Sequence, residues 1–308
     1  MGMSRRLRFI PEGGALVEVT CRTLHSRLLF RPGPTLNEII IGALARAKCL
    51  YPVRLCCFAF LSNHFHLILE VDDARQLSRF MGHFNSKLAR EVGRLTGWRQ
   101  KIFERRYQAI VISGEEAAQV ERTKYVLSHG VKEDLVGRVR EWPGVHAVRA
   151  LTEGMVLEGY WFDRTREYAA RHRGKDYSRL EFATREILTL DPLPCWRHLP
   201  EEERRRRITA LVEDLEAEAA ARRERRGTKP LGTTAILIQN PHSKPTRTKK
   251  SPAPAIHAAS LAIRKGFRDL YREFVAAFRQ AAEKLQAGDR DAAFPLGCFP
   301  PALPFVGG

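Results

Sequence analysis

Residues 61–70 read Leu-Ser-Asn-His-Phe-His-Leu-Ile-Leu-Glu and place two histidines two positions apart within an apolar run. Because alternate side chains of a β-strand lie on the same face, His64 and His66 are expected to point the same way. The apolar residues between and after them, beginning with Phe65, then point the other way and can cover a hydrophobic core. The pattern predicts a strand whose histidine face can meet metal, water or substrate. A pair of histidines without any ligand is the alternative, since two ligands are too few for a stable metal site.

The sequence around this stretch predicts the order strand, helix, strand, strand, helix, strand. The expected elements are the strand Ala15–Arg22, the helix Thr35–Lys48 with Thr35 as its cap, the strand Pro52–Phe60, the histidine strand, the helix Ala74–Leu95 and the strand Tyr107–Ile112. The three residues 61–63 are too few for a parallel crossover, so the two strands they join are antiparallel neighbours. This order predicts an α+β, ferredoxin-like (RRM-like) fold, with a four-stranded antiparallel sheet and two helices on one face.

A third helix is expected directly after the fourth strand. Ser113 can cap it, Glu116 completes a Ser-x-x-Glu capping box, and Gly130 is the expected stop. A helix that enters from this point can cross the open face of the sheet, which carries the histidine pair. The prediction is therefore a catalytic helix on the face opposite the other two helices.

Three side chains of that helix, Arg122, Tyr125 and His129, share one stripe because they lie three and four positions apart. His129 can complete a metal site, Tyr125 can present its hydroxyl, and Arg122 can pair with a phosphate oxygen. A phenol has a reference pKa of about 10, so Tyr125 needs nearby positive charge to act as a nucleophile. Arg122, Lys124 and a divalent ion can supply that charge. A tyrosine at the core margin and a histidine placed by the helix dipole are the structural alternatives.

The composition indicates a polyanionic partner. The 308 residues include 52 Lys plus Arg against 35 Asp plus Glu, a formal charge of +17, and nucleic acid is the expected partner. Candidate phosphate-binding residues are Arg122, Lys124, Arg105 and Arg106. No apolar run approaches the roughly 20 residues of a spanning helix, so no membrane partner is expected and a cytoplasmic, nucleoid-associated location is predicted. The six cysteines form no Cys-x-x-Cys pair and are expected to be reduced and mostly buried.

The histidine strand, preceded by Asn63 and followed downstream by Tyr125 on a helix, resembles the HUH single-strand DNA transposases with one catalytic tyrosine. More narrowly, it is similar to the insertion-sequence-200-like and REP-associated tyrosine transposases (RAYT). The segments that correspond to the family's motifs are Tyr125-Val126-Leu127-Ser128-His129-Gly130, Asp134-Leu135-Val136 and Trp142-Pro143. His129 and Gly130 stand where that family usually has Asn and Pro. The resemblance covers about Arg8–Arg149.

The resemblance implies that His64 and His66 bind a divalent cation, Mg²⁺ or Mn²⁺. It also implies that Tyr125 attacks a DNA phosphate to leave a 5′-phosphotyrosine and a free 3′-hydroxyl. The family's third ligand usually lies four residues after the tyrosine, at the position of His129, and an imidazole there suits manganese, cobalt or zinc better than magnesium. Single-stranded or hairpin DNA as the substrate, and a homodimer, are further implications.

Two other functions fit the same sequence. A non-catalytic nucleic-acid-binding module on an RRM-like sheet shares the fold and the basic charge, although His64 and His66 occupy positions where such modules carry stacking aromatics. A host-retained transposase, or a replication or mobilisation nickase, would use the same chemistry as a mobile transposase, and the sequence does not separate these roles.

The chain is expected to divide into four regions. These are a catalytic domain at 1–150, a helical extension at 151–226, a basic flexible linker at 227–256, and a C-terminal helix with a Pro-rich tail at 257–308. Smaller features expected within them are a mobile basic arm at Met1–Arg8, a charged helix from Pro200 to about Arg226, a short strand at Ala235–Ile238, a helix at Ala255–Gly288 that docks on the catalytic domain or on a second subunit, and an extended tail from Phe294.

Overall fold

A five-stranded sheet forms the centre of the protein in a computed structural model, which describes residues 7–173, 176, 178, 180–245, 254–299 and 301. The strands are β1 (Ala15–Arg22), β2 (Arg54–Leu61), β3 (His64–Val71), β4 (Gln108–Ile112) and β7 (Ile256–His257), in the order β2-β3-β1-β4-β7. Every neighbouring pair is antiparallel except β4 and β7, which are parallel. The first four strands have the ferredoxin-like order, which confirms the predicted α+β fold class.

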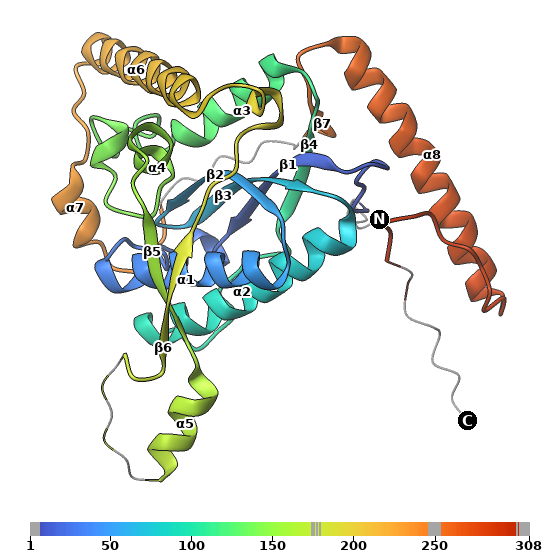
Figure 1. The fold of residues 1–308 in the computed structure, drawn as a ribbon, viewed down its shortest axis with the longest axis horizontal. Helices are drawn as coiled ribbons and strands as arrows, with labels where there is room; N and C mark the ends of the chain where they lie inside the picture. The colour runs from blue at the N-terminus through green and yellow to red at the C-terminus, as the bar shows by residue number, and fades with distance from the viewer. Residues whose placement is uncertain are drawn as a thin grey trace.

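Helices cover both faces of this sheet, as Figure 1 shows, with α1 (Pro34–Leu50) and α2 (Ala74–Thr96) on one side and α3 (Glu116–Leu127) on the other. Phe65 packs on Phe84 of α2, with ring centroids 5.6 Å apart, so the apolar side of β3 faces the core as expected. The side chain of Asp73 accepts a hydrogen bond from the Gln76 N–H at 2.6 Å and caps α2.

Both expected Ser/Thr caps in this domain are wrong. Helix α1 begins one residue earlier than expected, with Pro34 in its first turn, and so Thr35 lies inside the helix. At α3 the Ser113 hydroxyl donates to the Glu115 carboxylate at 2.8 Å, and Glu115 is the N-cap residue. Helix α3 ends at Leu127, and His129 therefore lies in the turn that follows it.

A second layer packs outside the central domain. Its elements are α4 (Val148–Glu153), the two-stranded sheet of β5 (Leu157–Phe162) and β6 (Ala183–Leu188), α5 (Arg164–His172) and α6 (Glu201–Arg226). Short 3₁₀ turns lie at Leu24–Ser26 directly after β1, and at Val139–Glu141 and Pro194–Trp196. The β5–β6 hairpin packs on α1, and α6 packs on α3 and α4. A Cβ atom on Gly159 of β5 would lie 2.2 Å from the Glu38 carbonyl oxygen, so this approach of strand to helix requires glycine.

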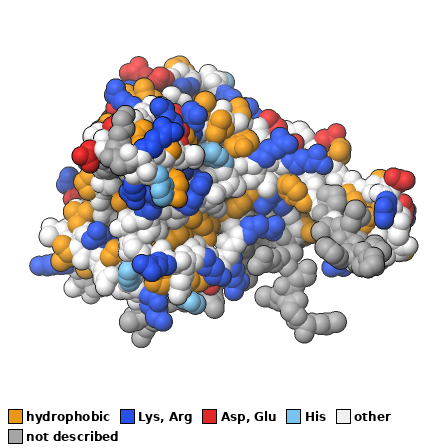
Figure 2. Space-filling model, turned by 90° about the horizontal axis from the view of Figure 1, so that it is seen from below, with side chains coloured by type: hydrophobic (Ala, Val, Ile, Leu, Met, Phe, Trp, Pro, Cys, Tyr) orange, Lys and Arg blue, Asp and Glu red, His pale blue; other side chains and the backbone are white. Residues whose placement is uncertain are grey.

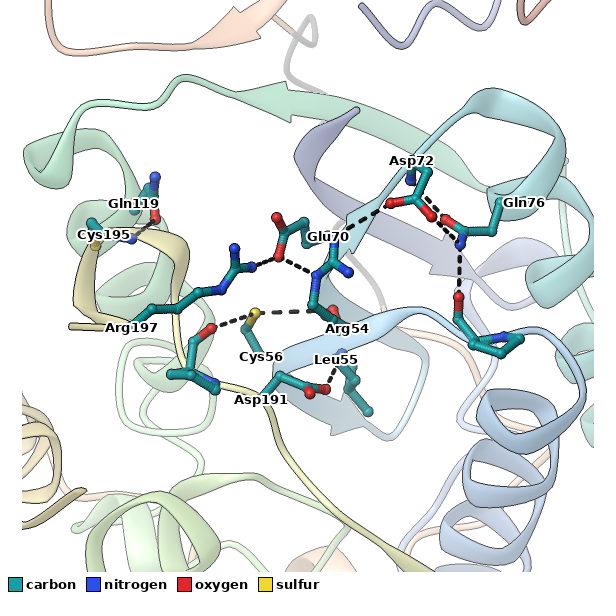
Figure 3. A network of polar contacts seen from close by, with 12 residues as sticks. Arg54, Leu55, Cys56, Glu70, Asp72, Gln76, Gln119, Asp191, Cys195 and Arg197 are labelled. Atoms are coloured by element: carbon teal, nitrogen blue, oxygen red, sulfur yellow. Dashed lines mark hydrogen bonds and ion pairs between the residues drawn. The ribbon is translucent and has the colours of Figure 1, made fainter. Parts of the chain in front are cut away.

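The segment before α6 links α3 to the sheet (Figure 3). The Asp191 carboxylate accepts hydrogen bonds from the Leu55 N–H at 2.9 Å and from Lys48, while the Cys195 N–H donates to the Gln119 side chain of α3 at 3.1 Å. At the far end of β3, the Glu70 carboxylate pairs with the guanidinium groups of Arg54 and Arg197. These contacts fix α3 over the sheet at some distance from the histidines.

The C-terminal part differs from the sequence prediction in two elements. Residues Thr233–Leu237 form a short helix, α7, where a strand was expected at Ala235–Ile238. The expected helix Ala255–Gly288 is shorter: its first residues form β7, and the helix α8 spans Leu261–Gln286. Its aromatic residues pack on Phe9, with ring centroids 5.5 Å away for Phe267 and 4.8 Å for Phe274.

Other expectations fall partly outside the described residues. Residues 1–6 of the basic arm, 246–253 of the linker, and 300 and 302–308 of the tail lie outside them. Within the linker, the Leu28 N–H donates to the Ser243 carbonyl at 3.0 Å, so residues up to 245 contact the central domain. The division into four regions stays a prediction.

The described surface carries the positive charge that the composition indicates. Figure 2 shows Lys and Arg side chains spread over the face seen from below, with hydrophobic side chains between them. Among the described helices, none combines the length and the apolar character that a membrane crossing needs.

Candidate metal centre and tyrosine nucleophile

Three histidines from two elements meet above the sheet. His64 and His66 lie on the same face of β3, with ring centroids 5.1 Å apart. His129, in the turn after α3, lies 4.3 Å from His66 and 5.5 Å from His64 by ring centroids. One potential ligand atom from each of the three residues lies within 4.8 Å of the others. The structure therefore brings together the three residues that the sequence analysis named as metal ligands.

Hydrogen bonds orient each of the three rings through its Nδ1 atom. The partners of Nδ1 are the Asn63 side-chain oxygen at 2.6 Å for His64, the Glu18 carboxylate at 2.8 Å for His66, and the Tyr125 carbonyl oxygen at 2.9 Å for His129. A ring that donates from Nδ1 keeps its lone pair on Nε2. All three imidazoles can thus present Nε2 to a metal, the arrangement that metal-binding histidines usually show.

The surroundings also favour the neutral form of two of these rings, His64 and His129. Burial, together with the neighbouring histidines, holds the pKa of His64 well below its ordinary value. Burial and His66 have the same effect on the pKa of His129. Because a metal binds the neutral form of imidazole, these residues fit a divalent ion. Three nitrogen donors favour manganese, cobalt or zinc over magnesium, which prefers oxygen ligands.

Glu18 of β1 connects the histidine centre to the rest of the site. Its side chain is 3% exposed, and besides His66 it contacts a guanidinium nitrogen of Arg122 at 2.9 Å and Nε2 of His257 at 3.0 Å. Burial alone would raise the pKa of Glu18, but the hydrogen bonds from His257 and His66 and the charge of Arg122 lower it well below its ordinary value. A buried carboxylate with three donors stays ionised and fixes the orientation of all of them.

Tyr125 lies beside the histidines under two cations. Its ring centroid is 4.8 Å from that of His129 and 5.7 Å from that of His66. The Arg122 guanidinium lies 4.0 Å and the Lys132 ammonium 4.5 Å from the centre of the Tyr125 ring. Burial and the Glu18 charge raise the pKa of the phenol, and Arg122 opposes that rise. The phenol is half-buried and is therefore open to a ligand on one side.

The other candidate phosphate-binding residues lie at different places. Lys124 forms an ion pair with Glu218 of α6 at 2.8 Å, and Lys132 is the second cation at the Tyr125 ring. Arg105 and Arg106 are exposed in the segment just before β4. They lie next to the end of β1, since the Glu104 N–H donates to the Arg22 carbonyl at 3.0 Å.

Sequence reasoning missed three residues of this site. Glu18 lies in a strand with alternating apolar residues, and an acidic residue at an inward position of such a strand is a sequence signal for a functional site. His257 lies far along the chain on a two-residue strand, and no sequence pattern connects it to β1. Lys132 comes close to Tyr125 only because the chain turns back after Leu127.

Comparisons with known proteins give partial structural similarity. No family model matches the chain, and no curated protein matches it. A solved REP-associated tyrosine transposase bound to a REP hairpin is 20% identical, with a TM-score of 0.38, over 49% of this chain and 86% of that one. A candidate transposase from Deinococcus radiodurans R1 is 14% identical, with a TM-score of 0.28, over 40% of this chain and 94% of that one. Both neighbours are described as transposases. Because identities and TM-scores are this low, the function is inferred below from the geometry of the site.

Proposed function

We propose that this protein is a metal-dependent enzyme that nicks and rejoins single-stranded or hairpin DNA, as in DNA transposition, with Tyr125 as the nucleophile. The observation that carries the proposal is the position of the Tyr125 phenol beside three imidazoles whose Nδ1 atoms are all engaged. A bound divalent ion, Mg²⁺ or Mn²⁺, would polarise the scissile phosphate and stabilise charge on the leaving oxygen. His64, His66 and His129 are the residues that would hold it.

The residues of the chain account for the remaining steps. The Tyr125 oxygen forms a bond to phosphorus and loses its proton to solvent, while the bond from phosphorus to the 3′ oxygen breaks. The products are a 5′-phosphotyrosine and a DNA 3′-hydroxyl, which takes up a proton. Arg122 and Lys132 favour the phenolate and can contact the phosphate oxygens. Rejoining is the reverse attack by a 3′-hydroxyl, which releases Tyr125.

In this structure Tyr125 and the three histidines come from one chain. A homodimer and a cytoplasmic, nucleoid-associated location stay predictions. A nickase retained by its host would use the same chemistry. A non-catalytic nucleic-acid-binding module would keep DNA binding and form no covalent product, and the experiment below includes that outcome.

The test is incubation of a labelled hairpin DNA with the full chain and Mn²⁺, followed by a denaturing gel. We expect a covalent protein–DNA adduct that disappears in Tyr125→Phe and in the double variant His64→Ala/His66→Ala. Tyr168→Phe, at an exposed tyrosine of α5, is the matched control and should keep the adduct. Nicking that persists in Tyr125→Phe would remove this tyrosine from its role, and binding without any adduct would favour the non-catalytic module.

A further inference from the structure

A cavity of about 410 Å³ lies between the first half of α3 and the β7–α8 segment. Glu121 and Arg122 of α3 form one wall, and His257, Arg264 and Arg268 lie on the other. This volume is within the range of small-molecule sites and is large enough for a nucleotide unit. The cavity is separate from the histidine centre but shares Arg122 with the Tyr125 side of the site.

The charge of this cavity is positive. Arg264 and Arg268 are four positions apart on α8, so they lie on the same face of that helix. Within the described part of the chain, no carboxylate lies within 4 Å of either guanidinium, and Arg264 donates from Nε to the Ala258 carbonyl at 2.8 Å. Arg122 and His257 both contact Glu18, which offsets part of the Arg122 charge. The charge available to a ligand therefore comes mainly from Arg264 and Arg268, against two acids, Glu121 in the cavity wall and Glu115. The pKa of Glu115 is lowered by the hydrogen bond from Ser113 and in part by the charge of Arg264.

The walls of the cavity are fixed before any ligand binds. The Ser113 N–H donates to the His257 carbonyl at 2.8 Å, which extends the β4–β7 pairing. The Glu115 carboxylate accepts from the N–H groups of Ala259 and Ser260 at 2.9 and 3.0 Å and joins the start of α3 to the start of α8. A ligand therefore meets a preformed site and loses little affinity to ordering the protein.

The cavity also lies next to the nucleophile along α3. Arg122 lines the cavity and places its guanidinium 4.0 Å from the centre of the Tyr125 ring. Since residues three apart on a helix are neighbours, one turn of α3 separates the cavity from the reacting oxygen. That turn rises only about 5.4 Å along the helix. A strand whose phosphate reaches Tyr125 can place its next nucleotide in the cavity.

We propose that this cavity between α3 and the β7–α8 segment binds the nucleotide that flanks the scissile phosphate, with Arg264 and Arg268 on its phosphate. The identity of the ligand as single-stranded DNA rests on the proposed function. The C-terminal part of the chain is then part of the DNA-binding surface, because it supplies most of the residues that line the cavity.

Binding of a fluorescein-labelled oligo(dT) 20-mer to the full chain tests this proposal. The measurement uses a Tyr125→Phe background without metal, so that no cleavage takes place. Each lost phosphate contact on a single strand lowers the slope of log K against log salt by about 0.7. Because both arginines are placed on one phosphate, Arg264→Ala/Arg268→Ala should lower that slope by about 0.7 and weaken binding about tenfold at 0.1 M salt.

The matched control is Arg272→Ala/Arg279→Ala, which removes the same charge from exposed positions on the same helix outside the cavity. We expect less than a twofold change for it. Glu121→Gln, which removes the acid of the cavity, should tighten binding about two- to threefold. Equal losses in the two arginine double variants, or no loss in either, would overturn the proposal. If the unmodified chain forms the covalent adduct but Arg264→Ala/Arg268→Ala binds the oligonucleotide normally, the nicking proposal stands and the cavity proposal is rejected. If the double variant binds more weakly but the unmodified chain forms no adduct, the cavity proposal stands and the nicking proposal is rejected.

Discussion

Replacing Glu18 by Gln should weaken metal binding although Glu18 is not itself a ligand. The carboxylate contacts Nδ1 of His66 at 2.8 Å, Arg122 at 2.9 Å and His257 at 3.0 Å. Gln has the same size but only one acceptor oxygen, and its amide nitrogen would face a donor. At least one of the three contacts is therefore lost, and the His66 ring is no longer fixed in the tautomer that offers Nε2 to a metal.

The expected magnitude follows from measured effects of such outer partners. Changing a group that orients a metal-ligating histidine typically costs about 10- to 100-fold in metal affinity, or about 1.4–2.7 kcal/mol. We place Glu18→Gln toward the upper end, because its side chain is 3% exposed and water cannot replace the lost contact. Tyr125 should also be affected, since Arg122 is held by the same carboxylate.

Calorimetric titration of the full chain with Mn²⁺ measures this effect. The matched control is Glu70→Gln, because Glu70 is an acid of the same sheet, half-buried where Glu18 is buried, that contacts two cationic groups, Arg54 and Arg197 (Figure 3). The control should lose some stability and keep its manganese affinity. If Glu18→Gln binds manganese as tightly as the unmodified chain, or if both variants lose affinity equally, the proposed role of Glu18 is refuted.

Two further predictions concern stability. Gly159→Ala should lower the free energy of unfolding by about 2 kcal/mol in urea titrations, because its Cβ would lie 2.2 Å from the Glu38 carbonyl oxygen. The control Gly82→Ala, where a Cβ would meet nothing within 4 Å, should be neutral or stabilising. Equal effects of the two substitutions would contradict the close approach of β5 to α1. Burial lowers the pKa of His146 from 6.5 to about 4, so the unfolded chain binds the proton first as pH falls and stability is lost between pH 6.5 and 4. His146→Asn should remove roughly 2 kcal/mol of the stability difference between pH 7 and pH 5, and an unchanged pH dependence would exclude this residue.

The sequence was most informative where local pattern and tertiary structure agree. Alternation in β3 placed Phe65 toward the core and the two histidines together on the other face, and the structure confirms both. The position of His129 near them followed from the order of elements, because a helix that begins after the fourth strand has to cross the open face. Its precise place was not predictable, since α3 ends at Leu127 and the turn after it orients the ring.

Long-range and very short elements could not be predicted in the same way. The strand β7 has only two residues, and the apolar pattern of α8 extended the helix prediction over it. A strand this short is specified by its partner β4 and not by its own residues, so His257 had no local signal. The residues Ala235–Ile238, most of which lie in α7, were expected to form a strand, but four residues are too few to distinguish the helical period of 3.6 residues from the strand period of two.

The contact of Glu18 with His257 joins the first strand of the sheet to the last. Contacts between such distant parts of a chain form late in folding, because closing a long loop costs entropy before the contact is made. Strands β1 to β4 and helices α1 to α3 can assemble before β7 arrives at the sheet edge. We therefore expect a refolding chain to bring the three histidines together first and to add the contact between His257 and Glu18 afterwards.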